Sequence, residues 1–137
     1  MEKNLIIYPT LLNVILVFLL YTKNTLDNRK AIKSKSLKMS YFKAYSGNVP
    51  DYVAVSRQTL KNQFELPILF YFLISIILYF DQVFLTDLFF AWLFVISRYL
   101  HAYIRLSSNK IKHRSITFQV GFYTLLLWFL KFSYNIF

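Results

Sequence analysis

The most restrictive feature of this sequence is the stretch from Asn4 to Thr22, which contains no charged residue. As an α-helix rising about 1.5 Å per residue it covers roughly 28 Å, close to the roughly 30 Å hydrocarbon core of a bilayer. A cleaved signal peptide would be followed by a small-x-small site, and no such site follows here. We therefore expect residues 4–22 to form a retained transmembrane span.

The other apolar stretches reach spanning length only when polar residues are included. Leu66 to Phe80 would cover only about 22 Å as a helix, so the second helix must begin near Ser56. Leu88 to Ser97 is shorter still, and its helix must continue to about Leu106. The later spans are expected at about residues 56–80, 84–106 and 115–134, with a basic, solvated loop at residues 23–55. The sequence thus predicts an all-α, integral membrane four-helix bundle in a single domain, residues 1–137.

Composition supports this class and excludes others. Apolar residues make up 57% of the chain and aromatic residues 20%, with only two glycines and three prolines, which suits long helices in lipid. A net charge of +10 would suggest nucleic acid in a soluble protein. Here the basic residues border apolar runs, so we expect membrane lipid and no nucleic acid as partner. No cysteine is present, and two histidines with six scattered carboxylates predict no metal site.

Charges in the connections predict the orientation. The first connection is dense in lysine and arginine and the third carries Lys110, Lys112 and Arg114, whereas the second, Asp81 to Asp87, has only acids. Basic connections stay in the cytoplasm, so both termini are expected on the non-cytoplasmic side. The polar ends of spans two, three and four then meet at the cytoplasmic face. Richness in lysine, asparagine and isoleucine suggests an AT-rich bacterial genome, and hence the bacterial inner membrane.

Two polar stripes enter the membrane on neighbouring helices. The stripe on the second helix follows an i, i+3, i+4, i+7 spacing: Gln58, Lys61, Asn62 and Glu65. The stripe on the third follows an i, i+3, i+7 spacing: Arg98, His101 and Arg105. An ionisable side chain that faces lipid costs at least about 2.5 kcal/mol, so both stripes should face protein or a wet cavity.

Two interpretations of these stripes remain open. In the first, their charges only pair with each other, for example Glu65 with Arg98, and hold the bundle together. In the second, they line a ligand pocket, because Lys61, Arg98, Arg105 and Arg114 face a single carboxylate, Glu65. Surplus buried positive charge calls for an anion.

Three strings in these regions resemble one family. Residues 57–67, RQTLKNQFELP, resemble the Asn-x-x-Glu-x-x-Pro-type signature of the second helix in the MAPEG family, the membrane-associated proteins of eicosanoid and glutathione metabolism. Residues 98–103, RYLHAY, resemble its Arg-x-x-His segment in the third helix, and residues 114–118, RSITF, its Arg-Ser opening of the fourth. The resemblance covers about residues 57–121 well and the first helix by hydropathy.

The resemblance implies a homotrimer of four-helix subunits that binds glutathione between neighbouring subunits near the cytoplasmic face. It implies that Lys61 and Arg98 hold the glutathione carboxylates and that Glu65 holds its ammonium group. The other residues implied in binding are Asn62, His101 and Arg105, with Arg29 or Lys30 added from the adjacent subunit. Glutathione also suits the surplus of cations noted above, because it carries two carboxylates and one ammonium group.

The resemblance assigns the chemistry to Arg114 and Ser115. A thiol reacts as the thiolate, and its pKa of about 8.5 falls beside a cation or a helix N-terminus. Both residues are expected at the start of the fourth helix, where the macrodipole adds positive potential, and the Ser115 hydroxyl could donate to the sulfur. The alternatives are a helix N-cap for Ser115 and a positive-inside anchor for Arg114.

Two tyrosines found in many family members are replaced here, by Arg105 and Phe118. The resemblance implies a glutathione-dependent membrane transferase or peroxidase that acts on hydrophobic electrophiles or lipid hydroperoxides, without a tyrosine hydroxyl at these two positions. The alternative is a non-catalytic lipid- or partner-binding membrane protein of the same fold. A small transporter is a third possibility, for which the sequence predicts neither a broken helix nor inverted repeats.

Overall fold

The computed structural model describes residues 3–136, and the regular elements in this range are all helices. The longest is α1 (Ile7–Lys33), which follows a 3-10 turn, η1 (Lys3–Ile6). The others are α2 (Tyr41–Ala44), α3 (Asp51–Lys61), a second 3-10 turn η2 (Asn62–Phe64), α4 (Leu66–Tyr79), α5 (Leu85–Leu106) and α6 (Ile111–Ile136). The prediction of an all-α chain is confirmed over this range.

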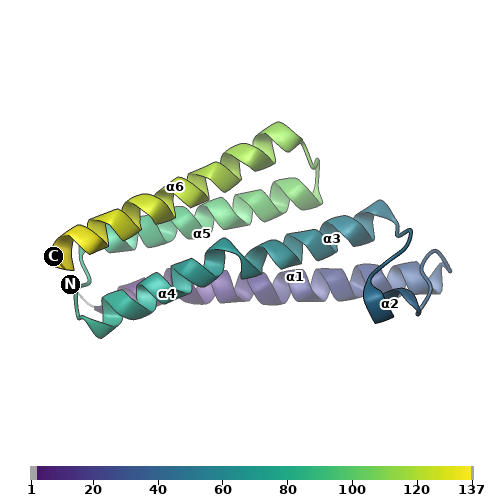
Figure 1. Ribbon diagram of the computed structural model, residues 1–137, viewed down its shortest axis with the longest axis horizontal. Helices are drawn as coiled ribbons and strands as arrows, with labels where there is room; N and C mark the ends of the chain where they lie inside the picture. The colour runs from purple at the N-terminus through teal and green to yellow at the C-terminus, as the bar shows by residue number, and fades with distance from the viewer. Residues whose placement is uncertain (1–2, 137) are drawn as a thin grey trace.

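The helices form one elongated bundle (Figure 1). α3 and α4 follow each other along α1, and α5 and α6 form an antiparallel hairpin beside them. The start of α1 and the end of α6 lie at the same end of the bundle. At the opposite end, α1, α2 and α3 extend beyond the turn between α5 and α6. The two halves of the bundle therefore differ in length at that end.

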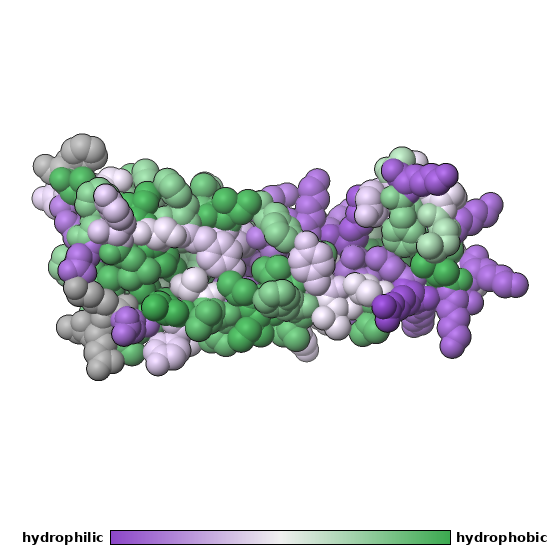
Figure 2. Space-filling view, turned by 90° about the horizontal axis from the view of Figure 1, so that it is seen from below, coloured by the Kyte–Doolittle hydropathy of each residue, from purple (hydrophilic) through white to green (hydrophobic). Residues whose placement is uncertain are grey.

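Helix length and surface chemistry identify an integral membrane protein. Three helical stretches are long and apolar enough to cross a membrane: Asn4–Lys33, Asp51–Tyr79 and Ile111–Ile136. α5 occupies the expected third span but carries Asp87, Arg98 and Arg105 and is not one of the three, so a fourth span stays a prediction. Large apolar side chains face outward, such as Phe18 (66% exposed) and Phe72 (63%). In Figure 2 they form a broad hydrophobic region, with hydrophilic residues gathered toward one end.

Aromatic rings fill the core where α4, α5 and α6 meet. Phe70, Phe94 and Trp128 have no exposed surface, and the Phe70 and Phe94 rings stack with centroids 4.6 Å apart. Phe90 stacks on Trp128 at 6.2 Å. Rings of this size bury large apolar areas and prefer defined geometries, so they hold α4 against the α5–α6 hairpin in one arrangement.

A buried carboxylate in the first turn of α5 joins this helix to the last turns of α6. Asp87 has no exposed surface and accepts hydrogen bonds from Trp128 Nε1 at 2.7 Å and from Lys131 Nζ at 2.8 Å to each oxygen. It also accepts from the backbone amide of Phe84 at 2.8 Å, which caps the start of α5. Asp87 therefore fixes the register of α6 along α5.

The prediction of a loop at residues 23–55 is wrong at both of its ends. α1 continues to Lys33, and α3 already begins at Asp51. Within the continuation, Lys23 pairs with Asp27 one turn later at 2.5 Å, and Ala31 is fully buried against α3 and the connecting segment. Charged residues disfavour the hydrocarbon core of a membrane, but they do not prevent a helix from continuing beyond it. Only residues 34–50, which include α2, connect α1 to α3.

The second span is interrupted. α3 ends at Lys61, η2 follows, and Glu65 has φ −103° and ψ −100°, which is outside the helical region. Pro67 accounts for the break, because it has no backbone N–H to donate to the carbonyl four residues earlier and its ring clashes there. The expectation of an unbroken second helix, with one polar stripe along it, is therefore wrong.

Gly121 allows α6 to pass close to α5. A Cβ at this position would lie 2.7 Å from Ser97 Oγ, which is itself held by a 2.6 Å hydrogen bond to the Phe94 carbonyl. Overpacking costs about 1–3 kcal/mol, whereas alanine gains at most about 1 kcal/mol in helix propensity, so Gly121→Ala should lower the Tm in detergent. Ser97→Ala removes the obstructing hydroxyl, and the double variant should recover most of the loss. A double variant as unstable as Gly121→Ala would contradict this packing explanation.

Candidate functional site

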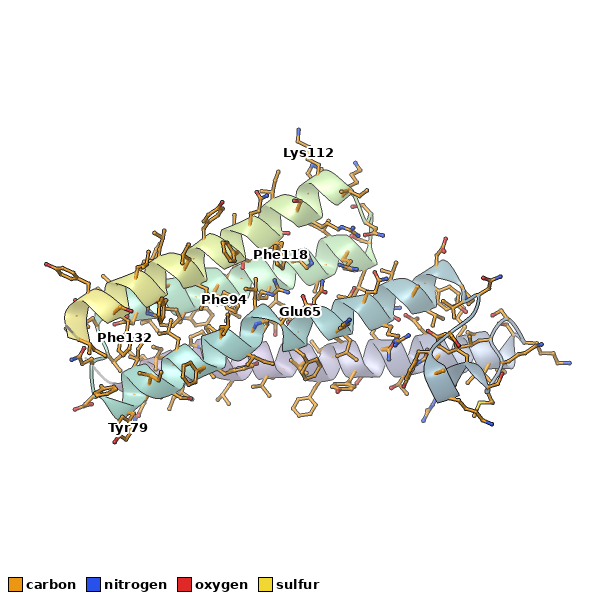
Figure 3. The ribbon with its side chains drawn as sticks, in the orientation of Figure 1. Glu65, Tyr79, Phe94, Lys112, Phe118 and Phe132 are labelled. Carbon is orange, nitrogen blue, oxygen red and sulfur yellow. The ribbon has the colours of Figure 1, made fainter. Side chains whose placement is uncertain are left out.

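A polar hollow of about 320 Å³ lies where the end of α3, the second half of α5 and the start of α6 meet. In Figure 3, Phe118 marks the α6 side of this region and Glu65 marks the break between α3 and α4. The residues that line the hollow are Asn62, His101, Arg105, Ile111, Arg114, Ser115 and Phe118. The structure thus gathers five of the predicted site residues, and no acid is among the lining residues that it describes.

Arg98 lies next to the hollow and has no exposed surface. Its Nη2 donates to the backbone carbonyl of Asn62 at 3.4 Å, and its guanidinium carbon lies 5.8 Å from the centre of the Phe118 ring. Its Nε and Nη1 have no hydrogen-bond partner within residues 3–136. A buried guanidinium with unused N–H groups is costly until an anion or water reaches it, so Arg98 draws negative charge toward the hollow.

His101, which is 3% exposed, connects α5 to the start of α6. Its Nδ1 lies 2.9 Å from the carbonyl oxygen of Arg114, so Nδ1 carries the proton and donates it to that bond. Its Nε2 lies 3.5 Å from the side-chain amide of Asn62. The imidazole therefore positions the Arg114 backbone on one side and faces Asn62 of η2 on the other.

Arg105 reaches across from α5 to α3. Its Nη2 donates to Gln58 Oε1 at 2.6 Å. When the Asn62 amide is oriented so that both of its ends are bonded, its oxygen accepts from Arg105 Nη1 at 3.0 Å and its nitrogen donates to the Gln58 carbonyl at 3.2 Å. Gln58 of α3 and Asn62 of η2 thus hold Arg105 at the rim of the hollow, while its Nε has no partner in the described part of the chain.

Arg114 and Ser115 come to the hollow from the first turns of α6. Arg114 Nη1 donates at 2.8 Å to Asn109 Oδ1, in the turn before the helix. Ser115 is exposed, and its hydroxyl forms no hydrogen bond to another described residue. Because α6 begins at Ile111, Ser115 lies inside the helix, and the N-cap alternative for Ser115 is wrong.

Lys61 and Glu65 lie outside the hollow, and both are exposed in the single subunit. The break after Lys61 turns the chain, so the residues of the second-helix stripe do not share one face. Glu65 is close enough to Arg98 and Arg105 to attract them electrostatically, but it forms no salt bridge with any residue from 3 to 136. The interpretation in which Glu65 and Arg98 pair with each other is therefore wrong for this pair.

Thr117 and Phe118 contribute to the site although no binding or catalytic role was predicted for them, and Gln58, a member of the second-helix stripe, contributes without having been predicted as a binding residue. Gln58 holds Arg105, and Thr117 Oγ1 donates to the Arg114 carbonyl at 3.0 Å. The Phe118 ring lines the hollow. Gln58 already lay on the stripe that helical spacing predicted, and Phe118 lies one helical turn after Arg114, so the same spacing could have found it.

One family model matches nearly the whole chain. The model of the MAPEG family covers residues 6–134, a range that includes every residue of the hollow. The resemblance seen in three short strings is thereby confirmed, and it extends to the first helix. No curated protein and no solved structure matches the chain.

Proposed function

The chain belongs to the MAPEG family, and on this premise we propose that it is a glutathione-dependent membrane transferase or peroxidase acting on hydrophobic electrophiles or lipid hydroperoxides. The family includes glutathione transferases and peroxidases as well as non-catalytic members, and its members generally use glutathione. The observation that carries the proposal is the buried Arg98, which has two unbonded nitrogens beside a hollow lined by two further arginines.

Glutathione suits the donors that this site offers. Its two carboxylates match the unused N–H groups of Arg98 and Arg105, and charge-assisted bonds of this kind are the strong ones. Lys61 adds an exposed cation near the end of α3. Glu65 is the proposed acceptor for the ammonium group, because no cation of the described chain forms a salt bridge with it. The remaining polar contacts in the proposal come from Asn62 and His101.

Arg114 and Ser115 are proposed to prepare the thiol, and bound glutathione would supply the nucleophilic sulfur. Arg114 lies in the first turn of α6, so its guanidinium and the unpaired amides of the helix end together favour a negative charge beside them. The free hydroxyl of Ser115 is available to donate to that charge. His101 holds the Arg114 backbone at 2.9 Å and thereby orients both residues. The proton of the thiol leaves to water through the open side of the hollow.

We propose a homotrimer with the site at the boundary between subunits, near the cytoplasmic face. A single subunit leaves the charged side chains of Lys61 and Glu65 exposed, and a neighbouring copy would cover them. Arg29 or Lys30 of that copy would add a cation. Four spans, both termini on the non-cytoplasmic side and the bacterial inner membrane belong to the same proposal. The basic residues near the end of α1 and the start of α6 support this orientation.

Turnover tests the proposal directly. The detergent-solubilised protein should conjugate glutathione to chlorodinitrobenzene, or reduce cumene hydroperoxide with glutathione, faster than a protein-free control. Glutathione binding without either activity would favour the non-catalytic alternative. The absence of both binding and activity would overturn the proposed function.

Glu65→Gln should weaken glutathione binding about tenfold, because the neutral amide loses a charge-assisted contact with the ammonium group. Isothermal titration calorimetry in detergent measures this affinity. Asp51→Asn is the matched control. Asp51 is an exposed acid at the start of α3, and the whole of this helix separates it from the hollow. An unchanged affinity in Glu65→Gln, or an equal loss in Asp51→Asn, would remove Glu65 from the binding site.

A non-catalytic lipid- or partner-binding protein of the same fold is the second candidate function. The observation that favours it is Arg105, which stands where many family members have a tyrosine and is bonded to Gln58 across the rim of the hollow. Phe118 likewise brings no hydroxyl to the site. The turnover assays above distinguish this candidate from the enzyme.

A further inference from the structure

A second polar hollow, of about 550 Å³, lies at the far end of the bundle, where the end of α1, the helix α2 and the turn after it meet. This is the end at which hydrophilic residues gather in Figure 2. The polar residues that line it are Lys35, Ser36, Lys38, Ser40, Ser46 and Asn48. We call it the cap hollow; none of its lining residues belongs to the glutathione site proposed above.

The two lysines that line the cap hollow have no anionic partner among residues 3–136. Between Asn28 and Pro50 the sequence has six lysines and arginines and no acid. Lys35 and Lys38 form no salt bridge with any residue that the structure describes. The hydroxyls of Ser40 and Ser46 likewise form no hydrogen bond within residues 3–136. The cap hollow thus offers ammonium groups and hydroxyls with unused donors.

The cap hollow is built on an ordered frame. Leu37 and Tyr41 also line it, and they are buried, with only 5% and 8% of their surface exposed. Arg57 of α3 contacts two tyrosines of this frame. Its Nη1 donates to the Tyr41 hydroxyl at 2.9 Å, and its guanidinium carbon lies 3.8 Å from the centre of the Tyr45 ring. A loop that only orients a helix in the membrane needs basic residues, but it needs no such frame.

We propose that the cap hollow binds a phosphate group. Two ammonium groups, several hydroxyls and an amide, with no carboxylate beside them, match the several acceptor oxygens and the negative charge of a phosphate. Gly47, with φ +106°, carries the backbone around one side of the hollow in a conformation that residues with a side chain rarely adopt. The proposal does not depend on whether the other hollow binds glutathione.

The position of the cap hollow bears on the source of the phosphate. α1 continues from Thr22 to Lys33, which is roughly 16 Å of helix and more than the roughly 5–7 Å depth of a headgroup layer. In an upright bundle the hollow is therefore open to soluble phosphate compounds. A tilt of the bundle would bring the phosphate of an anionic lipid to the same donors.

Two matched pairs of substitutions test the proposal in the full-length protein. Lys35→Gln with Lys38→Gln removes two cations from the cap hollow. Lys33→Gln with Lys43→Gln removes the same charge from the same end of the bundle without touching a lining residue. All four lysines are exposed, so both pairs should keep the Tm of the wild type.

Calorimetry with inorganic pyrophosphate gives the soluble arm, and native mass spectrometry of phosphatidylglycerol retained from mixed phosphatidylcholine micelles gives the lipid arm. The Lys35 and Lys38 pair should weaken binding about tenfold or more in at least one arm, and the Lys33 and Lys43 pair by less than about threefold. Loss in the pyrophosphate arm alone identifies a soluble phosphate compound, and loss in the lipid arm alone identifies a lipid headgroup. Equal losses in the two pairs, or no binding in either arm, would overturn the proposal.

Discussion

Replacing Arg114 with alanine should lower kcat/KM for the conjugation of glutathione to chlorodinitrobenzene by at least about 100-fold. Removing one group that stabilises developing negative charge typically costs about 10²–10³ in rate. Here the guanidinium is proposed to favour the thiolate, and the end of α6 supplies only the weaker potential of a helix terminus. Arg114→Lys keeps the charge but loses the planar fork, so it should recover part of the rate.

Lys112→Ala is the matched control for Arg114→Ala. Lys112 lies in the same turn of α6, is exposed and does not line the hollow, and its side chain points away from the bundle in Figure 3. We expect this variant to change the rate by less than about twofold, since an exposed charge is well screened. Because Arg114 also bonds to Asn109, the Tm of each variant should be measured beside its rate. Equal rates in the wild type and in folded Arg114→Ala would remove Arg114 from the mechanism.

Asp87→Ala should produce the largest loss of stability, about 3–5 kcal/mol in the free energy of unfolding. The substitution leaves the Lys131 ammonium group and the Trp128 indole N–H without their acceptor in the buried end of the α5–α6 hairpin. The Trp128 N–H has no exposed surface and cannot be hydrated, and the Lys131 side chain, 25% exposed, can be hydrated only in part. Unfolding in detergent, followed by the fluorescence of Trp128 and Trp92, measures the loss.

Asp27→Ala provides the contrast. Asp27 also pairs with a lysine, but its partner Lys23 lies one turn away on the same helix and has 46% of its side chain exposed. Once the carboxylate is removed, Lys23 can be hydrated, so the cost should be about 1 kcal/mol or less. If Asp27→Ala and Asp87→Ala lost the same stability, burial of the Asp87 network would not be the source of its effect.

Helix positions were largely predictable from the sequence, and the exceptions have physical causes. The length of the apolar run and the positions of the charges predicted a helix at residues 84–106, and α5 differs from this by one residue, because turns and acids mark its ends. The same criteria predicted that the first helix ends at Thr22, because a run without charged residues shows only which part of a helix can lie in lipid. α1 in fact continues to Lys33 and packs on α3, and a tertiary contact of this kind leaves no mark in local charge. Pro67 signalled the break in the second helix, but the run after Glu65 is too short to cross the hydrocarbon core alone, and this shortness predicted a continuous helix from about Ser56.

The candidate site was predictable where helices are regular. Arg98, His101 and Arg105 face the same region as their spacing predicts, because α5 is unbroken between them. Glu65 does not line the hollow with Asn62, since the periodicity that would align it fails at the break. Lys61 also lies outside the hollow, although it precedes the break. The bonds that hold Arg105 to Gln58 and Asn62 depend on how far α5 stands from α3, which helical spacing alone does not give.

The interruption of the second helix also supplies Arg98 with its acceptor. The Asn62 carbonyl belongs to the 3-10 turn η2, where hydrogen-bond geometry is poorer than in an α-helix, and it accepts from Arg98 Nη2 at 3.4 Å. In a straight helix that oxygen would accept from the amide of Leu66 and would be less open to a guanidinium from α5. The distortion and the buried charge are thus energetically coupled, so that each offsets part of what the other costs. A variant with a straight second helix would leave the Arg98 guanidinium with a poorer acceptor, and a variant without Arg98 would keep the distorted turn without the bond that it receives.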